Sequence, residues 1–320
     1  MYVSMIFAFA FVFIACALGT MFVDALFRFL GKRGYLGNLF PNVRGGIPRG
    51  VGIIPWIILS FYFLPGYNDL VLIIGLFALI DDVFGRRKFS FMDIEIGQFS
   101  RGLGMILVMV AGFIHGFGFS SIIIALLIQP LNISDMQPGS CAMVTMVMSI
   151  ITVICMLIAG TLPVNEIPAV YTPLLVFVVC LAYSPLDFMG KIMLGEVGNH
   201  TFAVALGISF YLIGGFWWTL LLSIFTVCFT AFVRRSTLKV FFRQNLRLLD
   251  PTFGDYVMDV LTGGGLGDLL RKWILKDKQY EITNEILVSF GFRRLLFNPH
   301  ASHPKAFVPK KTPSSLSKGD

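Results

Sequence analysis

The chain contains few charged residues. Only 13% of its 320 residues are charged, 56% are hydrophobic, and the mean hydropathy is +0.81. Because a soluble domain averages about 25% charged residues, this composition cannot cover a water-soluble globule, and it also excludes a disordered chain. The apolar residues form long continuous runs instead of the alternating pattern of an outer-membrane barrel. The sequence therefore predicts an all-α, polytopic helical membrane protein.

Cysteine motifs and a cleavable leader are also missing. No CxxC pair occurs, and every cysteine falls inside an apolar run, which favours small core residues over a disulfide or metal framework. The N-terminus has no basic segment before about 20 apolar residues, a length that favours a retained transmembrane helix over a cleaved signal peptide. The cysteines are Cys16, Cys141, Cys155, Cys180 and Cys228.

The apolar runs predict about nine to ten transmembrane helices. Nine runs can be delimited, and several are shorter than the ~20 residues that cross ~30 Å of hydrocarbon. Their limits are soft, because short runs can extend into neighbouring polar motifs or form broken helices. The candidate spans are 2–23, 51–65, 70–80, 99–115, 120–131, 141–160, 168–183, 201–214 and 216–233.

Lys and Arg are absent from one side of this predicted membrane domain. If the N-terminus lies outside and the spans alternate, the outer segments contain no Lys or Arg. Arg101 falls at the inner end of the fourth span, and the other 24 of the 25 basic residues fall in inner segments. Since cytoplasmic loops carry the excess of Lys and Arg, we expect a multi-pass protein of the inner (cytoplasmic) cell membrane with its C-terminus in the cytoplasm.

Acidic residues, which are costly near the hydrocarbon, stand at inner ends of spans. Asp81 and Asp82 end the third span. Two adjacent carboxylates repel each other, so a divalent cation would neutralise them, and Mg²⁺ commonly binds one or two carboxylates plus substrate phosphate. The alternative is a solvated helix end with the basic residues at 86–88 as counter-charges.

Two other inner segments carry polar residues beside glycine. Asn132 and Asp135 lie between two apolar spans, an arrangement also typical of helix capping. Residues 191–200 read Lys-Ile-Met-Leu-Gly-Glu-Val-Gly-Asn-His, so that a Gly-Glu-x-Gly turn opens a span. Such a turn brings backbone N–H groups and a helix N-terminus toward a ligand anion, with Lys191 as a charge for phosphate. The alternative is a capped glycine hairpin.

The first inner segment leads into the second span. Residues 41–52 read Pro-Asn-Val-Arg-Gly-Gly-Ile-Pro-Arg-Gly-Val-Gly. Four Gly and two Pro around two Arg are typical of a loop that approaches phosphate, although arginines beside a membrane also act as topology anchors. Each of the four segments is a weak signal alone, but together, on one membrane face, they indicate a site for a phosphate-bearing ligand.

In this order and spacing, the four segments resemble the polyprenyl-phosphate N-acetylhexosamine-1-phosphate transferases, the family of phospho-N-acetylmuramoyl-pentapeptide transferase and the undecaprenyl-phosphate GlcNAc-1-phosphate transferases. The resemblance covers about residues 1–233: the PN-x-R loop at 41–52, the Asp-Asp pair, the N-x-x-D loop from Asn132 and the K-I-x-x-G-x-x-G turn from Lys191. It implies a phosphoglycosyl transferase that moves a sugar-1-phosphate from a UDP-sugar to polyprenyl (undecaprenyl) phosphate and releases UMP, for peptidoglycan or other cell-envelope glycan synthesis.

The resemblance also implies roles for individual residues. Asp82 and Glu196 would hold Mg²⁺, and Asp81 would assist the attacking lipid phosphate. Asp135 and Asn132 would contact the nucleotide or support the metal, which makes Asp81, Asp82 and Asp135 the predicted catalytic residues. The other predicted substrate-binding residues are Asn42, Arg44, Lys191, Asn199, His300 and His303.

The chain departs from the family pattern at several positions. Glu196 and Pro138 stand where the family has Asp. A tail with His300 and His303 follows where the family has a His-rich loop and a final span, and these histidines either replace that loop or belong to a flexible end. One alternative is therefore a catalytically weakened member that binds polyprenyl phosphate or organises a membrane assembly. A transporter is a third possibility, which the acids at one face and the lack of an inverted repeat disfavour.

The basic excess of the chain belongs to its C-terminal tail. Residues 1–233 hold 10 Lys+Arg and 10 Asp+Glu, whereas residues 234–320 hold 15 and 8. We expect a cytoplasmic tail over 234–298 with amphipathic helices at 238–249, 266–276 and 281–297 and a glycine turn at 263–267, followed by a disordered end over 299–320. Its charge predicts binding to anionic inner-leaflet lipid or to a soluble partner, and not to nucleic acid. Oligomeric state, including a homodimer, stays open.

Overall fold

The computed structural model describes residues 2–41, 45–85, 87–88, 95–164, 167–246, 248–280 and 282–298. Over these residues the chain is helical and forms no β-strand; two isolated bridges, Lys88 with Glu95 and Val164 with Ile167, are the only β-type pairs in the described ranges. The chain divides into two compact units, Met1–Thr230 and Ala231–Asp320. The predicted all-α fold class is confirmed.

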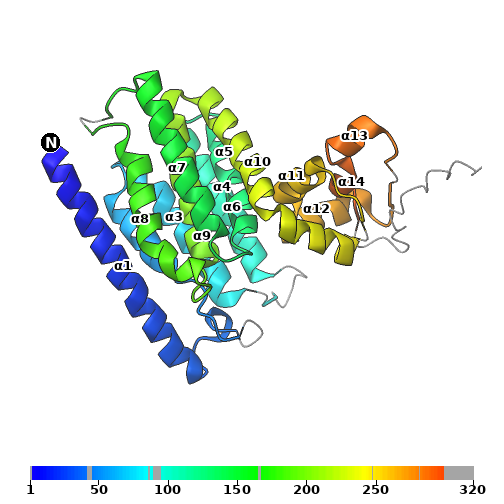
Figure 1. Ribbon diagram of the computed structural model, residues 1–320, viewed down its shortest axis with the longest axis horizontal. Coiled ribbons are helices and arrows are strands. Elements are labelled where there is room, and N and C mark those ends of the chain that lie inside the picture. Colours follow the sequence, from blue (N-terminus) through cyan, green and yellow to red (C-terminus); the bar gives the residue numbers. More distant parts are fainter. Residues whose placement is uncertain are drawn as a thin grey trace, which may run out of the picture. The chain divides into compact units, whose positions relative to one another are not determined.

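The first unit is a bundle of helices (Figure 1). A 3₁₀ turn, Gly37–Leu39, follows its first helix. The helices are α1 (Tyr2–Lys32), α2 (Ile53–Tyr62), α3 (Asn68–Phe84), α4 (Ile96–Ile114), α5 (Ser120–Leu126), α6 (Ile128–Ser134), α7 (Ser140–Ala159), α8 (Tyr171–Phe188), α9 (Gly195–Gly214) and α10 (Phe216–Phe241), the last of which continues into the second unit.

Six helices in the described ranges are long and apolar enough to cross a membrane: α1, α4, α7, α8, α9 and α10. The chain is thus a membrane protein with transmembrane helices, as predicted. The three other predicted spans correspond to the shorter helices α2 and α3 and to the pair α5–α6. The run 120–131 is interrupted at Leu127, because Pro130 has no N–H for Leu126 and its ring crowds that carbonyl.

Helix α9 is the most completely buried of the membrane helices. Its small residues Ala203 and Ala205 are fully buried, and a side chain on Gly207 would meet Ile124 and Leu127. Small residues let membrane helices approach closely, so α2, α3, α5, α6, α7 and α8 all pack against α9. The polar start of α9 is therefore held at the centre of one end of the bundle.

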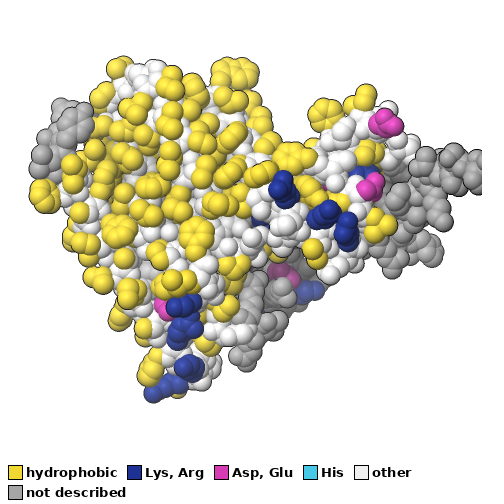
Figure 2. Space-filling view, viewed as in Figure 1, with side chains coloured by type: hydrophobic (Ala, Val, Ile, Leu, Met, Phe, Trp, Pro, Cys, Tyr) yellow, Lys and Arg dark blue, Asp and Glu magenta, His cyan; other side chains and the backbone are white. Residues whose placement is uncertain are grey.

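Large apolar side chains cover the outside of the bundle (Figure 2). In the view of Figure 2 they spread over most of the first unit, and Lys and Arg side chains gather at its lower end, where α1 ends in Figure 1. A continuous apolar surface of this extent suits contact with lipid. Exposed apolar residues include Phe7, Phe11, Leu18 and Phe22 of α1 and Ile154 and Leu157 of α7.

The second unit is a small helical body. It contains a π-helical segment, Phe242–Leu246, and the helices α11 (Phe253–Thr262), α12 (Gly265–Leu275), α13 (Glu285–Ser289) and α14 (Phe292–Leu295). Buried ion pairs join α14 to α11: Arg293 Nη2 lies 2.7 Å from Asp255 Oδ2, and Arg294 Nε lies 2.5 Å from Asp259 Oδ1. These contacts, together with packing, make the predicted amphipathic tail a folded unit.

Helix α11 is absent from the sequence prediction for the tail. It begins with a capping box in which Thr252 accepts a hydrogen bond from the Asp255 N–H, while Asp255 accepts one from the Thr252 N–H. The Thr-x-x-Asp spacing of a capping box is readable in a sequence and would have revealed the helix. The glycine turn expected at 263–267 is shorter, since α12 begins at Gly265. The end expected to be disordered, 299–320, lies outside the described residues.

Candidate functional site

The loop before α2 is joined by backbone hydrogen bonds to the turn before α9. The N–H of Met193 donates to the carbonyl of Pro48 at 2.8 Å, and the N–H of Gly52 donates to that of Leu194 at 3.0 Å. Glycine makes this approach possible, because a Cβ on Gly52 would lie 2.5 Å from the Cα of Gly198. The glycines of two predicted motifs therefore serve backbone-to-backbone contact between segments about 145 residues apart in sequence.

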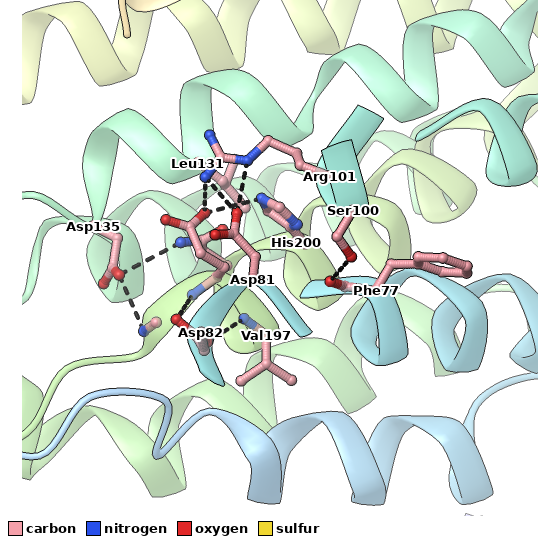
Figure 3. Close-up of polar contacts among 12 residues, drawn as sticks. Phe77, Asp81, Asp82, Ser100, Arg101, Leu131, Asp135, Val197 and His200 are labelled. Atoms are coloured by element: carbon pink, nitrogen blue, oxygen red, sulfur yellow. Dashed lines mark hydrogen bonds and ion pairs between the residues drawn. The ribbon is translucent and has the colours of Figure 1, made fainter. Parts of the chain in front are cut away.

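Two carboxylates occupy the N-terminus of α9. Asp82 accepts hydrogen bonds from the N–H groups of Glu196 at 3.1 Å and Val197 at 2.9 Å, as Figure 3 shows. Asp135 accepts one from the N–H of Gly195 at 3.2 Å and one from the amide of Asn199 at 3.4 Å. A helix N-terminus favours negative charge. The protein's own aspartates accept hydrogen bonds from the N–H groups that we expected to face a ligand anion.

Arginine pairs with each of the three acids at the centre of the site. Arg101 of α4 lies 2.8 Å from Asp81 Oδ2 through Nη2 and 3.0 Å from Glu196 Oε2 (Figure 3). Arg49 lies 3.1 Å from Asp82 Oδ1 through Nε and 3.1 Å from Glu196 Oε1 through Nη2. The two guanidinium groups thus tie together the end of α3 and the start of α9.

The acids of these ion pairs are almost completely buried. The Asp82 side chain is 0% exposed, and those of Asp81 and Glu196 are 8% and 10% exposed. His200, one turn after Glu196 on α9, is fully buried and places Nε2 3.2 Å from Glu196 Oε2. Although burial lowers the pKa of Arg49, the carboxylates of Asp82 and Glu196 outweigh it and raise that pKa above its ordinary value, so Arg49 stays charged.

A second polar group lies on the other side of the α9 N-terminus. Burial, and then the neighbouring Asp187 carboxylate, raise the pKa of Asp135 well above its ordinary value. Asp187, near the end of α8, is buried and accepts a hydrogen bond from the N–H of Gly139. Within the described residues, Asp187 Oδ2 and Asn199 Oδ1 have no hydrogen-bond partner. These buried oxygens are acceptors that a ligand donor or a water could satisfy.

The structure brings five of the predicted site residues together: Asp81, Asp82, Asp135, Glu196 and Asn199. Asn132 is half-buried on α6, three residues before Asp135. Lys191 is exposed, and its carbonyl accepts a 2.5 Å hydrogen bond from Arg28 Nη2, which brings the end of α1 to the same end of the bundle. The remaining candidates, Asn42, Arg44, His300 and His303, lie outside the described residues.

Four residues of the site escaped sequence reasoning: Arg49, Arg101, His200 and Asp187. Arg101 enters the sequence argument only as a basic residue at the inner end of a span, although an arginine inside an apolar helix is itself a signal of function. His200 follows Glu196 at the i,i+4 spacing that places two side chains on one helix face, and this relation could have been read directly. Arg49 belongs to the glycine loop that we expect to approach phosphate, but its pairing with Asp82 depends on the fold. Asp187 carries no comparable local signal, because only the fold brings it to Asp135.

The carboxylates of Asp82 and Glu196 are suited to bind one Mg²⁺ between them. No group of three His, Cys, Asp or Glu that could hold a metal occurs in the described ranges. Mg²⁺, however, is usually held by one or two carboxylates together with substrate phosphates instead of by an all-protein cage. Three buried carboxylates against two guanidinium groups leave one negative charge uncompensated. The donor chemistry therefore fits a cation that is completed by phosphate.

Comparison with known proteins gives no relative: the chain matches no protein-family model, no curated protein and no solved structure.

Proposed function

We propose that the protein is a phosphoglycosyl transferase that moves a sugar-1-phosphate, an N-acetylhexosamine or a derivative of one, from a UDP-sugar to polyprenyl phosphate and releases UMP. One observation carries the proposal: segments from four distant parts of the sequence meet in one buried cluster of acids and arginines at the N-terminus of α9. These are the segments that resemble the transferase motifs. Buried charges at the ends of membrane helices are costly and are functional candidates for that reason.

The position of the cluster suits a lipid phosphate as substrate. Asp81 and Arg101 meet at one end of the α3–α4 pair, whereas Asp69 and His115 meet at the other end, 2.7 Å apart. The positive-inside rule assigns the Asp81 end to the cytoplasm. At the cytoplasmic edge of the inner membrane, the headgroup phosphate of a polyprenyl lipid and a cytoplasmic nucleotide sugar can both reach the cluster.

The reaction forms a bond between a lipid-phosphate oxygen and the β-phosphorus of the UDP-sugar, and breaks the bond from that phosphorus to the bridging oxygen, which leaves with UMP. Asp81, fixed by Arg101, would position or deprotonate the attacking phosphate. Lys191, which is exposed, would hold phosphate oxygens. Mg²⁺ bound through Asp82 and Glu196 would supply positive charge against the diphosphate.

The test is release of UMP by detergent-purified protein given undecaprenyl phosphate and a panel of UDP-sugars. We expect Mg²⁺-dependent release that Asp82→Asn abolishes. Asp69→Asn, the same change at the opposite end of α3, is the matched control and should leave release unchanged. Undiminished UMP release by Asp82→Asn would show that Asp82 does not bind the Mg²⁺. Absence of UMP release with every UDP-sugar would reject the transferase.

The second candidate is a non-catalytic relative that binds polyprenyl phosphate or organises a membrane assembly. It is favoured by one observation: every acid of the cluster already has a protein partner, and the α9 N–H groups are capped by Asp82 and Asp135. This candidate predicts binding of undecaprenyl phosphate by the purified protein without UMP release from any UDP-sugar.

We further propose that the second unit rests on the anionic inner leaflet through α12. Leu270, Trp273 and Ile274, spaced to share one helix face, are 56%, 76% and 60% exposed. Exposed Lys276 and Lys278 follow directly. An apolar stripe with tryptophan beside lysines is typical of a helix lying in the membrane interface, and the chain enters this unit straight from the membrane helix α10.

A further inference from the structure

Arg49 occupies the positions at which a cation would meet Asp82 and Glu196. Its Nε and Nη2 atoms each lie 3.1 Å from one carboxylate oxygen, Oδ1 of Asp82 and Oε1 of Glu196. The other oxygen of Asp82 is held by the N–H of Val197, and that of Glu196 lies 3.0 Å from Arg101. A divalent cation cannot bind these two carboxylates while Arg49 bridges them, because both need the same oxygens and both are positive.

Charge balance indicates what happens when a cation enters. Asp81, Asp82 and Glu196 carry three negative charges, which Arg49 and Arg101 reduce to one. With a divalent cation in the place of Arg49, the three carboxylates and Arg101 come to zero net charge. The displaced guanidinium then provides a further positive charge, and phosphate is the ligand that its planar fork fits best.

Arg49, and not Arg101, is the arginine placed for such an exchange. Arg49 lies on the loop before α2, and its side chain is 22% exposed. Arg101 projects from within α4, is 16% exposed and donates from both Nε and Nη2 to Asp81, at 3.3 Å and 2.8 Å. Moving Arg101 would leave Asp81 without its partner in a buried site, which is strongly unfavourable.

We propose that Arg49 competes with the divalent cation for Asp82 and Glu196, holding the site closed without ligand and transferring to substrate phosphate when the cation binds. The phosphate step rests on the proposed function. The competition rests only on the geometry of Arg49, Asp82 and Glu196, so the two can fail separately.

The experiment measures Mn²⁺ binding to the full-length protein in detergent, without nucleotide or lipid phosphate, by electron paramagnetic resonance of the free ion. We expect Arg49→Gln to bind Mn²⁺ at least tenfold more tightly than the wild type, because the two carboxylates lose their competitor. Arg28→Gln is the matched control, since among the described residues Arg28 pairs only with Asp24 and the carbonyl of Lys191. The Mn²⁺ affinity of this variant should equal that of the wild type.

A second variant locates the site. Arg49→Gln combined with Glu196→Gln should lose the gained affinity, and Arg49→Lys, which keeps the charge but cannot bridge as a fork, should fall between wild type and Arg49→Gln. Equal Mn²⁺ affinity in wild type, Arg49→Lys and Arg49→Gln would overturn the proposal, as would gained binding that survives loss of Glu196. Tighter Mn²⁺ binding in a protein that never releases UMP would support the exchange and reject the transferase.

Discussion

Replacing Gly195 by alanine tests the close packing on which the site depends. Gly195 is the first residue of α9 and has a φ of +74°, in the left-handed region. An L-residue in this conformation lowers the stability of the fold by roughly 1–2 kcal/mol. An added Cβ would lie 2.7 Å from Asp82 Oδ2 and 2.7 Å from the Cα of Gly50. Overpacking of this kind costs about 1–3 kcal/mol. We therefore expect Gly195→Ala to destabilise the protein by about 2–5 kcal/mol.

Gly116→Ala separates the two costs. Gly116 has a φ of +84°, but a Cβ there would meet nothing within 4 Å. Gly116→Ala should therefore destabilise the protein only through the strained backbone conformation, by about 1–2 kcal/mol. Gly102 lies in α4 with no atom within 4 Å of the added Cβ, so Gly102→Ala should be neutral or stabilising by up to ~1 kcal/mol.

The assay is thermal unfolding of the three variants in detergent, followed by tryptophan fluorescence at one scan rate. For a body of this size, 1 kcal/mol corresponds to about 2–4 °C in Tm, so the variants should rank Gly102→Ala, Gly116→Ala, Gly195→Ala from most to least stable. If Gly195→Ala unfolds at the same temperature as Gly116→Ala, then Asp82 and the Gly50 loop do not approach Gly195 as closely as the structure shows.

The remaining predictions concern four separate places. Glu196→Asp should preserve or raise UMP release if Glu196 is a cation ligand, and full release by Glu196→Ala would remove that assignment. His115→Gln, which breaks a half-exposed pair, should change stability by less than about 1 kcal/mol and leave UMP release intact. Thr252→Ala should destabilise the second unit by about 1 kcal/mol through loss of the capping box, and Thr252→Ser should restore it in a thermal unfolding assay. In nanodiscs with anionic lipid, brominated lipid should quench the fluorescence of Trp273, which is measured as the difference between the wild type and Trp273→Phe. If iodide quenches this fluorescence and brominated lipid does not, Trp273 lies in water.

Some features of the site could be read from the sequence because local chemistry encodes them. Asp81 and Asp82 at the end of an apolar run, and Glu196 in a glycine turn, are unusual near a membrane whatever the tertiary structure. Their order along the chain, with basic residues restricted to alternate segments, places them on one face. Proximity of Asp82 to the start of α9 follows from packing between residues more than 110 positions apart, and no local pattern predicts it.

The pairing of Arg49 and Arg101 with the buried acids could not be predicted from the sequence. Arg101 as a sequence signal is equally consistent with a membrane anchor and with a partner of buried acids. Its role is decided by α4 packing beside α3, with Gly97 leaving room for the Asp81 carboxylate: a Cβ there would lie 2.1 Å from Asp81 Oδ1. The same holds for Arg49, which becomes a bridge only because the glycine loop pairs with the turn before α9.

An all-helical membrane fold follows from the amino-acid sequence alone, because continuous apolar runs with little charge satisfy their backbone hydrogen bonds in lipid by forming helices. The sequence also predicts that acids collect at the ends of the spans on one membrane face. How those acids are neutralised depends on the packing of the helices, because a buried charge is stabilised by whichever partner lies within ion-pair distance. Here that partner is arginine for Asp81, Asp82 and Glu196, and backbone N–H groups for Asp82 and Asp135.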